Sequence, residues 1–173
     1  GCLPTEFVEE IVALASHHRV MMAADSQASS QLADIGRFHN MRLITPTERE
    51  ARMSLKDQSS GLVVVAERLL GSSSSENVIV TLGADGMLIH AKVGEGRQTD
   101  RLPALNPSPR DVAGAGDSFF CLASLALAAG SDIWTASLLG AVAAAWSASR
   151  VGNLPLSADE IVGELKSALG EVA

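Results

Sequence analysis

The chain has 173 residues, of which 47% are hydrophobic, and it carries a formal net charge of −7. This length is enough for one domain with a substantial core, whereas the negative charge argues against a nucleic-acid backbone as a partner. Aromatic residues make up only 3% of the chain and tyrosine is missing, so stacking platforms for bases are not expected either.

The apolar runs and the two cysteines give information on the cellular compartment in which the protein is expected. The longest apolar run, residues 119–129, is too short to cross a membrane, so no membrane partner is expected. The first residues lack the basic start of a secretory signal. Cys2 and Cys121 do not form a disulfide framework, and Cys121 lies in an apolar helical segment. These features predict a cytoplasmic protein.

The first half of the chain alternates helical and strand patterns. The predicted elements are helices over 5–15 and 61–70, a helix that opens within 47–52, and strands over 19–25, 41–45 and 78–82. The serine-rich segment 71–75 is expected to end the second helix. Helices that alternate with buried strands predict an α/β domain with a mostly parallel sheet of about five strands and helices on both faces.

The second half contains more helix. Gly83 and Gly86 flank a predicted turn, and a strand over 87–90 follows it. Residues 92–110 are expected to form a loop because Pro103, Pro107 and Pro109 exclude a long helix. Three helices are then predicted, over 116–129, 133–146 and 158–169, with Asp132 as the N-cap of the second.

Asp25 stands at the end of the first predicted strand, where ligands collect in parallel sheets. An equally good interpretation is that Asp25 caps the polar segment 26–30. The four histidines show no metal-ligand spacing and are interpreted as surface or capping residues.

The segment Asp111–Asp117, with Gly114 and Gly116 one residue apart, leads directly into an apolar helix. The free N–H groups and the dipole at such a helix start attract an anion. Asp117 would repel a resting phosphate, so its expected use is to accept a proton from a nucleophile that attacks one. The alternative is a tight turn with an ordinary first-turn acid. A dinucleotide fingerprint fails because Phe119 takes the place of its third glycine, and no Walker A loop is present.

A second motif begins at Pro46. Thr47 followed three residues later by Glu50 is a capping box, which is a sufficient structural reason for this pair.

Three ordered segments together resemble the ribokinase-like (PfkB-type) carbohydrate kinases. Residues 111–119 are similar to the family's DTTGAGDxF signature, with Val112 and Ala113 in place of the two threonines. Residues 77–86 resemble the strand and TLGxxG nucleotide loop. Residues 43–51 resemble the PNxxE segment, with Thr47 in place of asparagine. The 46–52 segment and the Arg150–Asn153 ending are closer to the heptose-kinase-like branch.

The resemblance implies ATP-dependent phosphorylation of a sugar or sugar-phosphate hydroxyl. Asp117 would be the general base, and the helix start from Gly114 to Asp117, with the N–H groups around Ala115, Gly116 and Asp117, would form the anion hole. Magnesium would be positioned by Glu50 through water, and a monovalent cation, such as potassium, by Asp111. The residues implied to bind nucleotide are Thr81, Gly83, Ala84, Gly86, Gly140 and Ala144.

The small residues of the 133–146 helix also fit plain helix packing, which is the safer interpretation for most of them. Two alternatives to a sugar kinase remain open: a nucleotide-binding module without catalysis, and a vitamin-precursor kinase of the hydroxymethylpyrimidine type. Residues 1–173 are expected to form one domain, equivalent to the C-terminal portion of a longer sugar kinase, with the N-terminal half and lid missing. Such a portion should be inactive alone. A second copy of the chain is included among the expected partners, in a homodimer.

Overall fold

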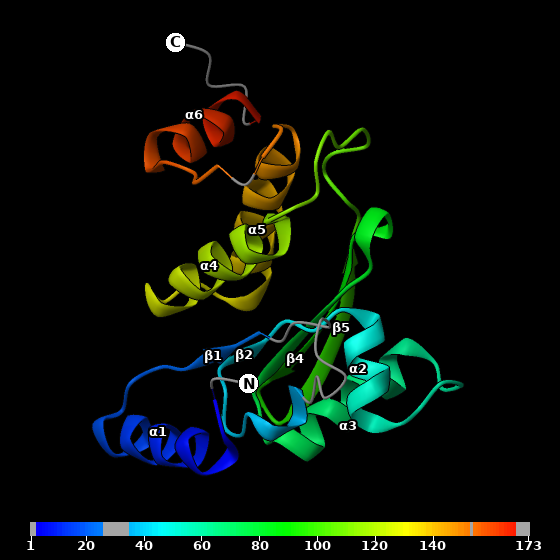
Figure 1. Cartoon of the computed structure of the whole chain (residues 1–173), viewed down its shortest axis with the longest axis vertical. Coiled ribbons are helices and arrows are strands. Elements are labelled where there is room, and N and C mark those ends of the chain that lie inside the picture. Colours follow the sequence, from blue (N-terminus) through cyan, green and yellow to red (C-terminus); the bar gives the residue numbers. More distant parts are fainter. Residues whose placement is uncertain (1–2, 26–34, 153, 169–173) are drawn as a thin grey trace. The chain divides into compact units, whose positions relative to one another are not determined.

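The computed structural model describes residues 3–25, 35–152 and 154–168 (Figure 1). The chain divides into two compact units, Gly1–Leu102 and Pro103–Ala173, and each unit is described by itself. Within the described residues, no helix combines the length and apolar character needed to cross a membrane.

The first unit is built on a five-stranded sheet in the order β1-β2-β3-β4-β5. Its strands are β1 (Ala23–Ala24), β2 (Leu43–Ile44), β3 (Asn77–Thr81), β4 (Met87–Val93) and β5 (Gly96–Leu102). The pairing of β1 with β2 and of β2 with β3 is parallel, as predicted, whereas β4 and β5 continue the sheet antiparallel. The predicted α/β architecture is confirmed, and the sheet is mixed.

Three α-helices belong to this unit: α1 (Thr5–His18), α2 (Glu48–Leu55) and α3 (Leu62–Ser73), with short 3-10 turns η1 (Ile35–Arg37) and η2 (Gly83–Asp85). Figure 1 shows α2 and α3 beside each other next to the strands, and both helices contact β3. Val65, Leu69 and Leu70 of α3 form one buried cluster with Val78 and Val80 of β3. Ala51 of α2 belongs to the same cluster, so α2 packs together with α3 and β3.

His90 of β4 is buried, with 4% of its surface exposed, so its interpretation as a surface or capping residue was wrong. Its Nδ1 lies 2.6 Å from Thr99 Oγ1 on β5, and its Nε2 lies 2.8 Å from Glu67 Oε2 on α3. The histidine therefore ties the helix to both strands of the hairpin. Its hydrogen bond is the main reason that the pKa of Glu67 is lowered.

Two predictions of element bounds were wrong. Residues 92–110 are not all loop, because β4 continues to Val93 and β5 occupies Gly96–Leu102. The three prolines that motivated the prediction all lie beyond β5. The serine-rich segment also does not end α3 at Leu70, since the helix continues to Ser73 and the Ser73 hydroxyl donates back to the Leu69 carbonyl at 2.8 Å.

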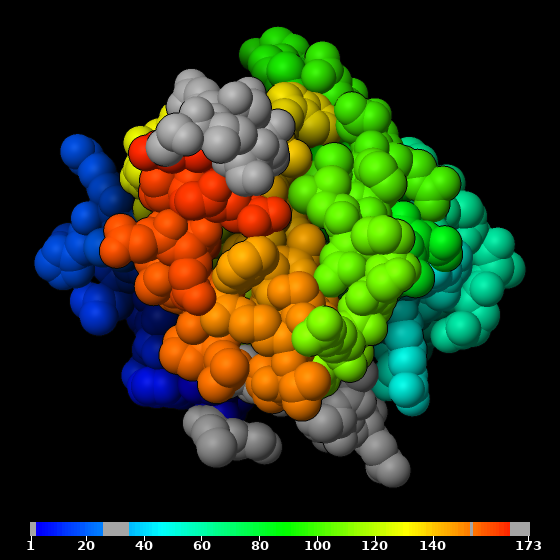
Figure 2. Space-filling view, turned by 90° about the horizontal axis from the view of Figure 1, so that it is seen from above, coloured from blue at the N-terminus to red at the C-terminus, as the bar shows by residue number. Residues whose placement is uncertain are grey.

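The second unit contains α4 (Ala115–Ala128), α5 (Ile133–Ala148) and α6 (Ala158–Ala168). Asp132 caps α5 as predicted, because its Oδ1 accepts the N–H groups of Trp134 and Thr135. In Figure 2 the orange-to-red atoms of α6 border the orange atoms at the end of α5, and the two helices are in contact. Arg150, just after α5, donates to Glu160 of α6 at 2.9 Å.

Some predictions fall on residues that the structure does not describe. The polar segment 26–30, Asn153 and Leu169 lie outside the described residues.

Candidate active site

The helix start at α4 has the geometry of an anion site. Gly114, the N-cap, has a φ of 77°, which glycine adopts without the strain that other residues incur. The N–H of Ala115 was expected to contribute to the anion hole. It donates instead to the Val112 carbonyl at 3.2 Å, so it is not free for an anion. The N–H groups of Gly116 and Asp117 have no acceptor among the described residues. The donors available to an anion are therefore those of Gly116 and Asp117.

Gly116 has no structural reason to be glycine. Its φ is not in the left-handed region, and a Cβ built there would meet no atom within 4 Å. Alanine would also suit the first turn of a helix better than glycine does. What glycine adds at this position is open space beside a free N–H, which suits the close approach of a ligand.

Asp117 lies in the first turn of α4 and is exposed. In the part of the chain that the structure describes, its carboxylate has no hydrogen-bond or ion-pair partner. A carboxylate that is exposed, unpaired and next to two free N–H groups can accept a proton from a bound hydroxyl group.

Asp111 joins two loops of the second unit. Its Oδ1 accepts the Ala113 N–H and its Oδ2 accepts the Gly152 N–H, both at 3.0 Å. These two backbone N–H groups, Ala113 first, lower the pKa of Asp111. The contacts explain the acid as a brace for the loop before α4, and the cation role of Asp111 stays a prediction.

Gly140 of α5 is required by packing. A Cβ at this position would lie 2.8 Å from two ring carbons of Phe119 and 2.9 Å from the Phe119 carbonyl oxygen. Phe119 belongs to α4, so Gly140 lets the two helices approach closely. This contact accounts for the glycine without a nucleotide. Ala144, one turn further along α5, is half-buried. Nucleotide binding by either residue stays a prediction.

The first unit brings two of the predicted segments together. Thr81, the last residue of β3, donates its N–H to the Pro46 carbonyl at 2.9 Å, and Thr47 and Thr81 form a parallel β-bridge. The predicted turn after β3 is confirmed: Gly83 and Gly86 have φ angles of 61° and 85°, and Leu82 N–H donates to the Gly86 carbonyl at 2.8 Å. The Thr81–Gly86 turn thus lies beside the start of α2.

Asp25 and Thr45 follow the neighbouring parallel strands β1 and β2. The Thr45 hydroxyl donates to Asp25 Oδ1 at 3.0 Å, which places this acid at the carboxyl edge of the sheet.

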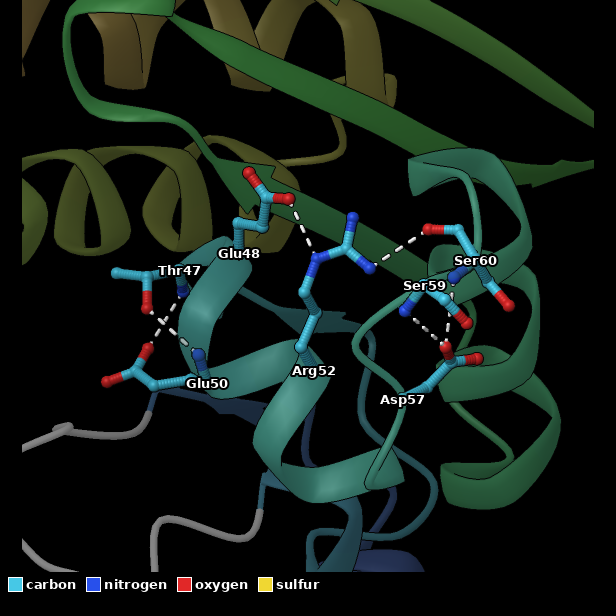
Figure 3. A network of polar contacts seen from close by, with 7 residues as sticks. All are labelled: Thr47, Glu48, Glu50, Arg52, Asp57, Ser59 and Ser60. Carbon is cyan, nitrogen blue, oxygen red and sulfur yellow. Dashed lines mark hydrogen bonds and ion pairs between the residues drawn. The ribbon is translucent and has the colours of Figure 1, made fainter.

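Glu50 forms the predicted capping box. Its Oε2 accepts the Thr47 N–H at 2.8 Å, and Thr47 Oγ1 accepts the Glu50 N–H at 3.2 Å. Figure 3 shows this pair on one side of α2 and Arg52 on the other. Glu50 is 2% exposed.

The described residues contain no group of three His, Cys, Asp or Glu side chains that could hold a metal ion. Magnesium needs fewer protein ligands than that, because it binds one or two carboxylates together with phosphates and waters. The second oxygen of Glu50 has no partner among the described residues, so this acid fits a hydrated magnesium ion.

A cavity of about 560 Å³ lies beside the start of α2. Its residues come from the start of α2, the loop after α2 and the end of β3: Thr47, Glu48, Arg49, Arg52, Met53, Gln58, Thr81, Leu82 and Gly83. Of these, the sequence reasoning placed Thr81 and Gly83 at the nucleotide and missed Arg49, Arg52 and Gln58. Two arginines within the motif segment were the available signal.

The wall of the cavity is held by a polar network (Figure 3). Arg52 Nε donates to Glu48 Oε1 at 2.8 Å, and its Nη1 donates to the Ser60 carbonyl at 2.9 Å. The buried Asp57 carboxylate accepts the N–H groups of Ser59 and Ser60 and pairs with Arg68. These bonds lower the pKa of Asp57 to about 2, and the hydrogen bond from the Ser60 backbone N–H makes the largest contribution.

The comparisons with known proteins agree with the motifs. The model of the pfkB family carbohydrate kinases matches residues 2–158. The chain belongs to this family. Its signature, nucleotide turn and capping-box segment all lie within the matched residues.

Curated relatives of this PfkB chain include bifunctional HldE proteins. The chain is 29% identical over 170 residues to that of Desulfatibacillum aliphaticivorans and 30% identical over 165 residues to that of Shewanella putrefaciens. These matches cover 96% and 94% of the chain but only 33% of each relative. The chain therefore spans about a third of the length of the curated relatives that it matches.

Solved structures confirm the ribokinase-like fold class. Ribokinase from Thermotoga maritima is 26% identical with a TM-score of 0.73, and the match covers 92% of the chain and 53% of the ribokinase. Phosphofructokinase-2 from Escherichia coli, solved in complex with potassium, has a TM-score of 0.77 at 18% identity, with 95% and 52% covered. The second match supports the fold alone.

Proposed function

We propose that the chain carries the nucleotide-binding and phosphoryl-transfer residues of an ATP-dependent carbohydrate kinase. The acceptor is a hydroxyl group of a sugar or sugar phosphate. Membership of the PfkB family supports the reaction class. The matches to HldE proteins and the heptose-kinase-like motifs support a heptose-type acceptor.

The proposed reaction is a direct transfer. The sugar hydroxyl loses its proton to the Asp117 carboxylate, and its oxygen attacks the γ-phosphorus of ATP. The bond between the γ-phosphorus and the bridging oxygen breaks, and ADP leaves with that electron pair. The N–H groups of Gly116 and Asp117 stabilise the charge on the transferred group. Thr81, Gly83, Ala84 and Gly86 contact the nucleotide.

Glu50 would hold a magnesium ion through water, and the ion would supply positive charge that neutralises the phosphate chain. The resemblance also assigns potassium to Asp111, which would act by holding the loop before α4. Phosphofructokinase-2 from Escherichia coli has been solved with potassium, which supports testing that ion.

The observation that carries the proposal is the exposed, unpaired Asp117 beside two free N–H groups at the start of α4. An acid that caps a helix accepts hydrogen bonds from the N–H groups of the first turn. Among the described residues Asp117 accepts none, whereas Asp132 at the start of α5 accepts two from the backbone.

The first test is nucleotide binding by this chain. Calorimetry should detect magnesium-dependent binding of ATP or ADP. No heat at millimolar nucleotide with folded protein would contradict the proposal.

The second test replaces the base. Because the chain spans about a third of its relatives, turnover is measured with the natural gene product that carries it. Asp117→Asn should lower kcat by about 10²–10⁴-fold, while ATP affinity holds or rises because a negative charge near the γ-phosphate is removed. Asp159→Asn is the matched control, since Asp159 is an exposed first-turn acid of α6 and its loss should leave kcat unchanged.

Three outcomes distinguish the alternatives. An Asp117→Asn enzyme with near-normal kcat would refute the general-base role. Tight nucleotide binding without transfer to any sugar by the natural gene product would favour a module without catalysis. Transfer to a hydroxymethylpyrimidine and not to sugars would favour the vitamin-precursor kinase.

A further inference from the structure

The side chains that line the cavity beside α2 include one positive charge that has no ion pair among the described residues. Three ionised side chains line the cavity: Glu48, Arg49 and Arg52. Glu48 and Arg52 form an ion pair at 2.8 Å and neutralise each other. Arg49 is exposed and has no hydrogen bond or ion pair in the described part of the chain. The cavity therefore has one uncompensated positive charge, which favours an anionic ligand.

The donors around Arg49 point to the same kind of ligand. In the capping box, Thr47 Oγ1 accepts the Glu50 N–H, which leaves the hydroxyl proton of Thr47 free to donate. The capping box also gives the Glu50 N–H an acceptor. The N–H groups of Glu48 and Arg49, the first two residues of α2, have no acceptor within the helix. The residues that carry this guanidinium group, this hydroxyl group and these two backbone N–H groups all line one cavity.

The cavity is organised before any ligand binds. Arg52 is fixed by two acceptors, Glu48 and the Ser60 carbonyl, and its side chain is only 17% exposed. On the other side, the N–H of Thr81 donates to the Pro46 carbonyl at 2.9 Å and fixes the end of β3. A volume of about 560 Å³ lies in the range of small-molecule sites. Walls held in this way reduce the ordering cost of binding.

We propose that Arg49 binds the phosphate chain of the nucleotide in this cavity and determines the affinity for ATP. This inference rests on the proposed function and adds to it a residue that lies outside the motif positions. Arg49 is one residue before the predicted metal-positioning Glu50, but it lines the cavity and Glu50 does not. Arginine binds phosphate oxygens in a bidentate, charge-assisted manner, which lysine and glutamine cannot reproduce.

The experiment uses calorimetry on the full chain with three probes: ATP, adenosine and inorganic triphosphate. Arg49→Gln should weaken the binding of ATP and of triphosphate by about 10- to 100-fold. The affinities of Arg49→Lys for ATP and triphosphate should lie between those of Arg49→Gln and those of the wild type. Adenosine lacks phosphate, so its affinity should be the same in every variant. Arg101→Gln is the matched control because Arg101 is exposed on β5 and its loss removes the same charge from the same unit.

The outcomes separate this inference from the proposed function. ATP binding within twofold of wild type in Arg49→Gln would overturn the role of Arg49 and leave the kinase proposal standing. Triphosphate binding that depends on Arg49, without any preference for ATP, would support the phosphate site and contradict the kinase proposal. An equal loss in Arg101→Gln would show a general effect of charge and overturn the inference. Binding of neither ATP nor triphosphate by the wild type would overturn both proposals.

Discussion

Replacing Gly140 by alanine tests whether this glycine serves helix packing. Alanine is favoured over glycine in a helix interior by about 1 kcal/mol. The added Cβ would lie 2.8 Å from the Phe119 ring and 2.9 Å from the Phe119 carbonyl oxygen, closer than real Cβ atoms come to other groups. Phe119 is 2% exposed, so its ring cannot turn outward, and the carbonyl belongs to the backbone of α4.

The packing term should outweigh the propensity term. Overpacking of this kind costs about 1–3 kcal/mol, and a contact with rigid backbone belongs in the upper part of that range. After the gain in helix propensity, Gly140→Ala should lower the free energy of unfolding by about 1–2 kcal/mol. With a urea m-value of about 2 kcal/mol/M, the midpoint should fall by about 0.5–1 M.

The assay is tryptophan fluorescence in urea. Both tryptophans, Trp134 and Trp146, lie on α5, so the signal reports on the helix that carries Gly140. Gly163→Ala is the matched control: Gly163 lies within α6, and a Cβ there would meet no atom within 4 Å. Its midpoint should rise, because only the propensity term acts. A Gly140→Ala midpoint at or above that of the wild type would refute the packing argument.

Two further changes test the helix start and the cavity wall. Gly116→Ala should leave the urea midpoint equal or higher, because its Cβ would meet no atom within 4 Å, and should weaken ATP binding by about tenfold or more in calorimetry. Unchanged ATP affinity would rule out close approach of the ligand at Gly116. The folded state lowers the pKa of Asp57 to about 2, so its stabilising effect should be complete above its unfolded pKa and be lost as pH falls toward 2. Asp57→Asn should remove that part of the acid dependence in urea titrations at pH 2–5; an unchanged pH profile would contradict it.

The sequence predicted elements whose cause is local. The capping box of Thr47 and Glu50 and the cap of Asp132 were both found as expected, because a side chain that bonds a nearby N–H depends on few other residues. The order of helices and parallel strands was also predictable, since apolar periodicity reflects burial on one face. The three ordered motifs indicated the family to which the chain belongs.

The errors came from elements that depend on their partners. β5 is polar and exposed at every position except the last, so no apolar alternation indicated a strand. It forms because β4 offers a ladder of backbone partners, with His90 opposite Thr99. The cavity was missed for a similar reason. Arg49 and Thr81 are far apart in the sequence, and they line one space because β3 pairs beside the start of α2.

The glycines of the second unit separate structural from functional requirements. Gly114 is needed for its left-handed φ of 77°, and Gly140 is needed because Phe119 occupies the space of a side chain. Neither reason applies to Gly116, where an alanine would fit and would favour the helix. A glycine that costs helix stability without a structural need supports a ligand at that position. Because Gly116 immediately precedes Asp117, the same ligand would lie within reach of the proposed base.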